Sequence, residues 1–129
     1  MKHLNLFTSV YKKMTENTDE ARPCFKLLGI IILVSYGLFY FFNLFLIEPN
    51  GTENIYLRIF ICILGALLLF HQYWEKKILI FSPIIFYFTI FFSFGFFFSY
   101  MLFKNPYSII WQLNELTGLV LLSVFLDWR

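Results

Sequence analysis

Residues 78–103 read ILIFSPIIFYFTIFFSFGFFFSYMLF and contain no charged side chain. A helix that crosses the hydrocarbon core of a bilayer needs about 20 consecutive, mostly apolar residues, because each residue advances it by about 1.5 Å. This stretch exceeds that length, and Pro83 lies near its beginning, where a proline in the first turn costs a helix least. The stretch therefore predicts a transmembrane helix.

Three further apolar segments flank this one and are joined by short polar links. They run over residues 25–47, 55–73 and 107–126. Of the 129 residues, 60% are hydrophobic and 14% are charged, which leaves too little polar surface for a soluble globule of this size. We therefore predict an all-α polytopic membrane protein, with a polar leader over residues 1–23 and a bundle of four transmembrane helices within residues 24–129.

The basic residues predict the orientation of these helices, because cytoplasmic loops carry an excess of Lys and Arg. The leader contains several Lys and Arg residues, whereas the first link, residues 48–54, contains none. The second link carries Lys76 and Lys77, and the third is a tight turn around Lys104. We expect the first and third links outside the cell and both termini in the cytoplasm.

The charge and the motifs argue against several classes of function. The net charge of +2 is small and the basic residues lie at segment ends, so we expect no nucleic acid partner. His3 and His71 lack the neighbours that a metal site or a catalytic triad needs. The chain contains no H-E-x-x-H, no G-x-S-x-G and no phosphate-binding glycine loop. We expect no catalytic residue, no metal and no cofactor, and membrane lipids as the surroundings.

Polar and small side chains are informative in a membrane bundle, because contact with lipid is costly for them and they turn inward. They recur at helical spacing as Gly29, Tyr36, Tyr40 and Asn43; as Arg58, Cys62, Gly65 and Leu69; as Ser82, Thr89, Ser93 and Tyr100; and as Ser108, Trp111, Asn114, Glu115 and Gly118. Gly65 would also let a neighbouring helix approach closely. We predict an aromatic and polar pocket in the outer half of the bilayer, because five of these residues fall there: Tyr40, Asn43, Arg58, Tyr100 and Trp111.

Glu115 and Arg58 are the charged residues that most need a partner. Glu115 falls near mid-membrane, where a carboxylate costs on the order of 2.5 to 3.5 kcal/mol. Arg58 lies about one turn inside its own segment, and its long side chain can reach toward Glu115. We predict an ion pair between them, which either locks the bundle or belongs to a ligand-responsive switch.

Several short motifs occur in a distinctive order along the chain. They are Leu57-Arg58, Lys76-Lys77, the run Phe96-Phe97-Phe98 followed by Met101, Leu102 and Asn105, and Ser108-Ile109-Ile110-Trp111. In these motifs residues 10–127 resemble the N-terminal membrane input region of the CqsS and LqsS quorum-sensing sensor histidine kinases. The last motif is the most specific, because it combines order, spacing and position in a helix.

The resemblance implies a ligand and a site. It implies that the region senses a lipophilic, long-chain α-hydroxyketone autoinducer within the membrane. A tryptophan at the position of Trp111 helps to hold the ligand head group in that family, and Asn114 stands where the family can have a ligand-discriminating serine. Tyr100 and Ser108 complete the candidate ligand-binding residues. Gly95 replaces the family's proline before the Phe run, so the kink of residues 78–103 is an open question.

The resemblance also implies a context for the chain. It places the protein in the bacterial inner membrane, as the input part of a two-component system that is a homodimer in a full-length receptor. The chain stops after its fourth predicted helix, before any phosphoacceptor or ATP-binding domain, so we expect no enzymatic activity of its own.

Two other classes of function remain open. A small structural or accessory membrane protein without a ligand would use the same polar stripes only to pack its helices. A transporter fragment is the least favoured class, because the chain has no internal repeat and no pair of broken helices.

Overall fold

Helices make up nearly all of the computed structural model, which describes residues 2–42, 45 and 54–126 and has no strand within them. Three helical segments are long and apolar enough to cross a membrane, namely Thr8–Phe42, Ser82–Lys104 and Ile109–Leu126. A fourth apolar helix, α3 (Ile55–Leu69), has 15 residues and is shorter than a typical span. The all-α class is therefore confirmed, together with apolar helices of membrane-spanning length.

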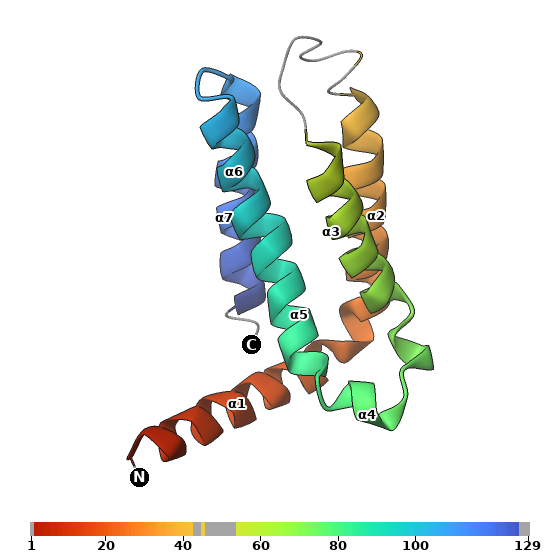
Figure 1. Cartoon of the computed structure of the whole chain (residues 1–129), viewed down its shortest axis with the longest axis vertical. Coiled ribbons are helices and arrows are strands. Elements are labelled where there is room, and N and C mark those ends of the chain that lie inside the picture. Colours follow the sequence, from red (N-terminus) through yellow and green to blue (C-terminus); the bar gives the residue numbers. More distant parts are fainter. Residues whose placement is uncertain (1, 43–44, 46–53, 127–129) are drawn as a thin grey trace.

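The leader forms a helix, α1 (Lys2–Ala21), that runs across one end of the bundle (Figure 1). A short 3-10 turn, Arg22–Cys24, with Pro23 in its first turn, joins it to α2 (Phe25–Phe42). The Tyr11 hydroxyl donates a hydrogen bond to the Ile80 carbonyl at 2.7 Å, and the Asn17 amide donates to the Tyr87 hydroxyl at 3.1 Å. The leader helix α1 is thus held by hydrogen bonds against the first part of the predicted segment 78–103. Of the predicted segment 25–47, residues 43, 44, 46 and 47 lie outside the described residues.

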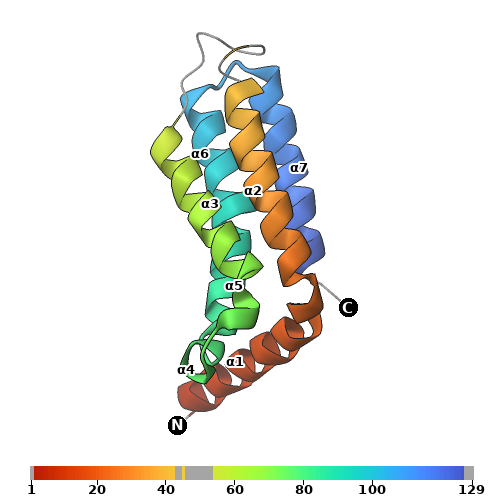
Figure 2. The ribbon, with the colours of Figure 1, turned by 90° about the vertical axis from the view of Figure 1, so that its right-hand side faces the viewer.

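Helices α2 and α3 lie side by side in both ribbon views and meet through two glycines (Figure 2). A Cβ atom on Gly29 would lie 2.6 Å from the Gly65 carbonyl oxygen and 2.7 Å from the Leu69 backbone nitrogen. A Cβ atom on Gly65 would lie 2.7 Å from the Ile32 side chain. The close approach predicted at Gly65 is confirmed, because only glycine fits where the two backbones nearly touch.

Helix α3 ends earlier than the predicted segment 55–73. Its last residue is Leu69, and a 3-10 turn, His71–Tyr73, follows it. The His71 ring nitrogen Nδ1 lies 2.9 Å from the Leu68 carbonyl, so the side chain satisfies a carbonyl that the helix end leaves open. A four-residue helix, α4 (Lys76–Leu79), then leads into the next long segment.

The predicted helix over residues 78–103 is interrupted twice. A break at Ile80 and Phe81 separates α4 from α5 (Ser82–Ile90), and Pro83 lies in the first turn of α5, as its position predicted. A π-helical turn, Phe91–Phe96, then joins α5 to α6 (Phe97–Lys104). Because a π turn closes hydrogen bonds from i to i+5, it adds about one residue and rotates the following helix by about 100°.

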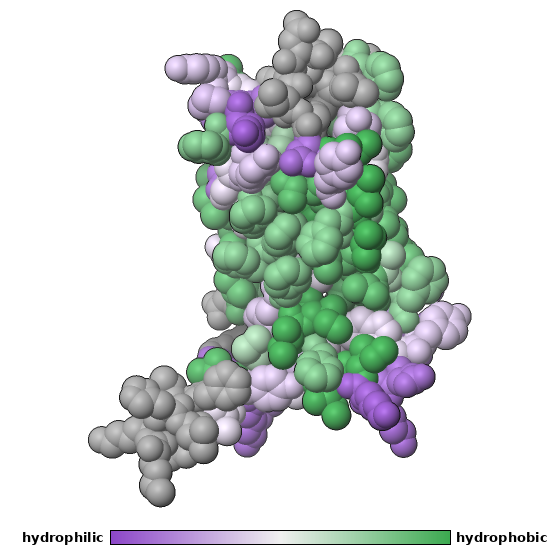
Figure 3. Space-filling view, viewed as in Figure 1, coloured by the Kyte–Doolittle hydropathy of each residue, from purple (hydrophilic) through white to green (hydrophobic). Residues whose placement is uncertain are grey.

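Helix α7 (Ile109–Leu126) packs closely against the π turn and α6. A Cβ atom on Gly118 would lie 2.5 Å from the Phe94 carbonyl oxygen and 2.3 Å from the Phe98 ring. Buried aromatic and aliphatic side chains from α2, α3, α5, α6 and α7 fill the space between the helices. Figure 3 shows hydrophobic side chains over the middle of one face and hydrophilic ones toward its two ends, as expected for a bundle within a bilayer.

Candidate functional site

A cavity of about 180 Å³ lies between α2, α6 and α7, in the half of the bundle that contains Arg58 in the first turn of α3. Its lining is mostly aromatic and aliphatic, with a few polar groups: Ile31, Ser35, Tyr36, Phe39, Arg58, Phe94, Phe97, Phe98, Trp111, Asn114, Thr117 and Leu121. The tight contact at Gly118 holds α7 against α6, and the cavity remains on the side of α7 that faces α2. An apolar cavity with a few convergent polar groups is the usual form of a small-molecule site.

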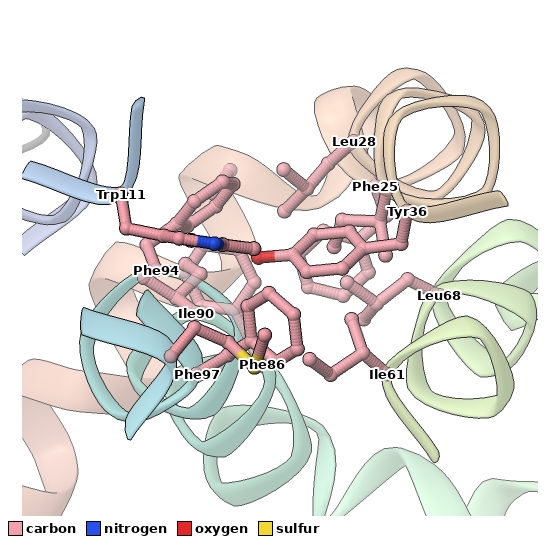
Figure 4. Close-up of a cluster of buried hydrophobic side chains, with 13 residues drawn as sticks. Phe25, Leu28, Tyr36, Ile61, Leu68, Phe86, Ile90, Phe94, Phe97 and Trp111 are labelled. Atoms are coloured by element: carbon pink, nitrogen blue, oxygen red, sulfur yellow. The ribbon is translucent and has the colours of Figure 1, made fainter. Parts of the chain in front are cut away.

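Three aromatic residues form the inner wall of the cavity. Tyr36 on α2 and Trp111 on α7 point toward each other across the bundle, with Phe97 beside them (Figure 4). The ring centroids of Phe97 lie 5.0 Å from Tyr36 and 6.1 Å from Trp111, both in edge-on geometry. The Tyr36 hydroxyl donates a hydrogen bond to the Ser93 carbonyl in the π turn. This bond ties α2 to the turn where the helical bonding pattern changes.

Arg58 brings a positive charge into the apolar interior, where its side chain is only 4% exposed. Its guanidinium carbon lies 5.3 Å from the ring centroid of Phe97, 5.8 Å from that of Tyr40 and 5.9 Å from that of Trp111. Its Nη1 atom donates a hydrogen bond to the Tyr36 carbonyl at 3.2 Å. Aromatic faces attract a cation, by about 2 kcal/mol or more when it is desolvated, so the rings stabilise the charge at the cavity wall.

Asn114 lines the cavity with an amide that can form hydrogen bonds to a ligand. Within residues 2–42, 45 and 54–126 its amide makes no hydrogen bond. The Thr117 hydroxyl, by contrast, already donates to the Leu113 carbonyl at 2.9 Å. An amide carries both a donor and an acceptor, so Asn114 can bond to a carbonyl or a hydroxyl on a molecule in the cavity.

Two predicted ligand-binding residues lie elsewhere. The Ser108 hydroxyl accepts a hydrogen bond from the Trp111 backbone N–H at 3.3 Å, the bond made by a residue that caps the start of a helix. Tyr100 faces α3, where its hydroxyl accepts from the Asn54 amide at 3.4 Å. Tyr100 does not line this cavity, so its role as a ligand contact stays a prediction. That prediction assumed one α-helical face along residues 82–100. The extra residue of the π turn turns Met101, which is 1% exposed, into the bundle in its place.

The predicted ion pair between Arg58 and Glu115 is not formed. Asn114 and Glu115 are adjacent on α7 and therefore point about 100° apart. Asn114 lines the cavity that contains Arg58, whereas Glu115 does not line it, and its Oε1 accepts a hydrogen bond from Ser99 on α6 at 2.8 Å. The two charged groups thus lie on different sides of the α6–α7 pair.

The structure adds cavity residues that the sequence patterns did not assign to a ligand, chiefly Tyr36, Phe97 and Thr117. Thr117 follows Asn114 by three residues, so the spacing of helical faces could have found it. None of the described residues that line the cavity is His, Cys, Asp or Glu, and no described group of three such residues could hold a metal. The described lining is therefore apolar with a few polar groups and one cationic side chain, that of Arg58.

Comparisons with known proteins gave no further guide, since no family model, no curated protein and no solved structure matched this chain.

Proposed function

We propose that the chain is the membrane sensory region of a two-component quorum-sensing receptor, and that a lipophilic α-hydroxyketone binds in the cavity between α2, α6 and α7. The observation that carries this proposal is the convergence of Trp111, Asn114 and Arg58 on one largely apolar cavity. The resemblance to the CqsS and LqsS sensors pointed to the first two of these residues as head-group contacts. The Asn114 amide and the Arg58 guanidinium supply donors for the ketone and hydroxyl oxygens.

The size of the cavity suggests how such a ligand is held. At about 180 Å³ the cavity is smaller than the roughly 300–1,000 Å³ usual for a site that encloses a whole small-molecule ligand. That volume fits the head group and the first carbons of a long-chain ligand. Ile31 and Phe39 line the cavity and are 45% and 48% exposed, so it opens at the outer side of α2. The rest of the alkyl chain would leave by this opening and lie among the lipid chains.

We also propose four membrane spans, with α3 as the fourth. At 15 residues α3 measures about 22 Å, less than the about 30 Å of a hydrocarbon core. It is nevertheless packed along α2 through Gly29 and Gly65, so it must share the depth of α2 in the membrane. Its shortness is compatible with the exposed aromatic side chains Tyr56 and Tyr73 near its two ends, because tyrosine suits the membrane interfaces.

The proposed orientation puts the end of the bundle with α1 and α4 in the cytoplasm of a bacterial inner membrane. Lys12, Lys13, Lys76 and Lys77 all belong to α1 and α4, whereas Lys104 lies at the other end. An excess of Lys and Arg marks the cytoplasmic side.

Thiol labelling tests this orientation. Tyr107 is 96% exposed in the turn between α6 and α7, and Tyr73 is 74% exposed at the opposite end. In a background with Cys24 and Cys62 replaced by serine, a membrane-impermeant maleimide should label Tyr107→Cys in intact cells and leave Tyr73→Cys unlabelled until the membrane is permeabilised. Labelling of Tyr73→Cys in intact cells, or equal labelling of both, would contradict the proposed topology.

A ligand titration tests the proposed binding. A long-chain α-hydroxyketone should change the tryptophan fluorescence of the purified protein and raise its stability, by about 2.7 kcal/mol at a hundred times Kd. Asn114→Leu should weaken binding about tenfold, because a lost hydrogen bond of about 1.4 kcal/mol is one power of ten.

Gln112→Leu is the matched control for Asn114→Leu. Gln112 lies on the same helix but bonds to the Pro106 carbonyl at 3.2 Å and does not line the cavity. It should bind the ligand with unchanged affinity. If fluorescence and thermal stability of the wild-type protein stay constant at saturating ligand, the receptor proposal fails and the accessory-protein alternative takes its place.

A further inference from the structure

The π turn Phe91–Phe96 releases a backbone carbonyl, and a side chain from another helix bonds to it. The Phe97 N–H donates to the Phe92 carbonyl, five residues earlier, whereas an α-helix would direct it to the Ser93 carbonyl. The Ser93 carbonyl instead accepts a hydrogen bond from the hydroxyl of Tyr36 on α2. Tyr36 thus stabilises the π bonding pattern by satisfying the acceptor that this pattern leaves open.

The Ser93 side chain favours the α-helical bonding pattern instead. Its hydroxyl is fully buried and, within the part of the chain that the structure describes, has no hydrogen-bond partner. In an α-helix a Ser or Thr hydroxyl can donate to the carbonyl four residues earlier, as Thr89 does to Ile85 at 2.7 Å. An uninterrupted α-helix would offer Ser93 the Thr89 carbonyl in the same way. Each bonding pattern therefore satisfies one buried hydroxyl, that of Tyr36 or that of Ser93.

The sequence after the turn gives α6 an apolar inner wall in either pattern. Without the extra residue, α6 would rotate by about 100°, and each of its residues would take the place of the one that follows it. Phe96 would replace Phe97, and Phe97 would replace Phe98, so phenylalanines would still occupy the places that line the cavity. One turn further along, Tyr100 would replace Met101 in the interior. That exchange is the main change inside the bundle.

The exchange of Met101 for Tyr100 links the π turn to the cavity. Met101 lies one turn after Phe97 on the same face of α6, and Phe97 lines the cavity. Long side chains on a helix lean toward its N-terminus, so a tyrosine in the place of Met101 would lean toward the cavity. An empty apolar space costs stability, and the tyrosine side chain would fill part of it. Tyr100 and a molecule in the cavity therefore compete for the same space.

We propose that α6 takes two positions, which regulate the proposed ligand site. In the open position the π turn is present, Met101 faces inward and the cavity can accept a ligand. In the rotated position the π turn is absent and Tyr100 occupies the cavity. Tyr36 is a positioning residue, because its bond to the Ser93 carbonyl stabilises the open position. A ligand that binds only the open position draws the equilibrium toward it, and this step alone rests on the proposed receptor function.

Cross-linking between α3 and α6 measures the two positions. Tyr100 faces α3 in the structure, where its hydroxyl accepts a hydrogen bond from the Asn54 amide at 3.4 Å, and Ser99 would take its place after rotation. The experiment uses the whole chain in lipid vesicles, with Cys24 and Cys62 replaced by serine. A short bifunctional maleimide should link Asn54→Cys to Tyr100→Cys in the open position and to Ser99→Cys in the rotated one. The pair with Ser99→Cys retains Tyr100 and therefore gives the quantitative measurement.

Two variants that each remove one hydroxyl should move this equilibrium in opposite directions. Tyr36→Phe loses the bond that stabilises the open position, so linking of Asn54→Cys to Ser99→Cys should rise about tenfold, the equivalent of about 1.4 kcal/mol. Ser93→Ala removes the hydroxyl that gains a partner in the rotated position, so the same linking should fall. No change in either variant, or changes in the same direction, would overturn the proposal, because a merely structural role would lower stability without moving α6.

Addition of a long-chain α-hydroxyketone separates this proposal from the receptor function. At a hundred times its Kd for the open position, the ligand should lower linking of Asn54→Cys to Ser99→Cys about a hundredfold. Calorimetric titration of the same protein measures binding. If the ligand binds while the linking stays constant or rises, the receptor remains and the switch is refuted. If the ligand does not bind while Tyr36→Phe and Ser93→Ala move α6 as expected, the two positions remain and the receptor is refuted.

Discussion

Replacing Gly29 by alanine should lower the free energy of unfolding by about 3 kcal/mol, the upper part of the usual range for an overpacked interior. The added methyl group would lie 2.6 Å from the Gly65 carbonyl oxygen and 2.7 Å from the Leu69 backbone nitrogen. Both atoms belong to a helix backbone, so no side chain can turn aside to make room. The only relief is for α2 and α3 to separate, which loosens the packing between them along their shared length.

Gly37→Ala is the control for this effect. Gly37 lies two turns further along α2, and a Cβ atom there would have nothing within 4 Å. The substitution should be neutral or stabilise the helix by up to about 1 kcal/mol, since alanine is the better helix former. Thermal unfolding in detergent, followed by circular dichroism, measures both variants. Equal midpoints for Gly29→Ala and Gly37→Ala would show that α2 and α3 do not meet as the structure has them.

The apolar segments of the fold could be predicted from the sequence, and their internal breaks could not. Length and hydropathy find the long helices, and Pro83 and Gly65 act as their residue types predict. The π turn at Phe91–Phe96 has no such signal, because its Phe-rich sequence suits an α-helix equally well. The helical leader does have a signal: Tyr11, Met14, Thr18 and Ala21 recur every three or four residues and form the side that docks.

The candidate site, like the fold, could be predicted from the sequence only in part. Trp111 and Asn114 lie three residues apart on one uninterrupted helix, so their shared face follows from helical geometry alone. Tyr100 lies outside the cavity lining because the π turn lies between it and the residues that set the inward face of α5. The partner of Glu115 is Ser99 and not Arg58, and the sequence could not predict this. Adjacent residues of α7 point about 100° apart, so the way α6 and α7 pack decides whether Asn114 or Glu115 faces Arg58.

Trp111→Ala and Phe97→Ala should have similar effects on stability and different effects on ligand binding. Both side chains are almost fully buried, at 3% and 1% exposed, and both contact Arg58 and each other. Truncating a buried Trp or Phe to alanine costs about 3–5 kcal/mol. If the cavity is only a packing defect, as the accessory-protein alternative requires, the two losses should be alike in every measurement.

A receptor predicts a difference, because the indole of Trp111 is also a hydrogen-bond donor for the ligand head group, and the Phe97 ring has no such group. The milder pair Trp111→Phe and Phe97→Leu should retain the fold well enough to measure binding, because these substitutions change the buried volume less than alanine does. Trp111→Phe keeps a ring beside Arg58 but removes the indole N–H, so its affinity for the α-hydroxyketone should fall about tenfold or more. Phe97→Leu should lower the thermal stability but lower the ligand affinity less than Trp111→Phe does. Calorimetric titration measures the binding, and thermal unfolding measures the stability. Equal falls in affinity for the two variants would contradict the role of the Trp111 N–H, and no measurable binding by the wild-type protein would favour a cavity without a ligand.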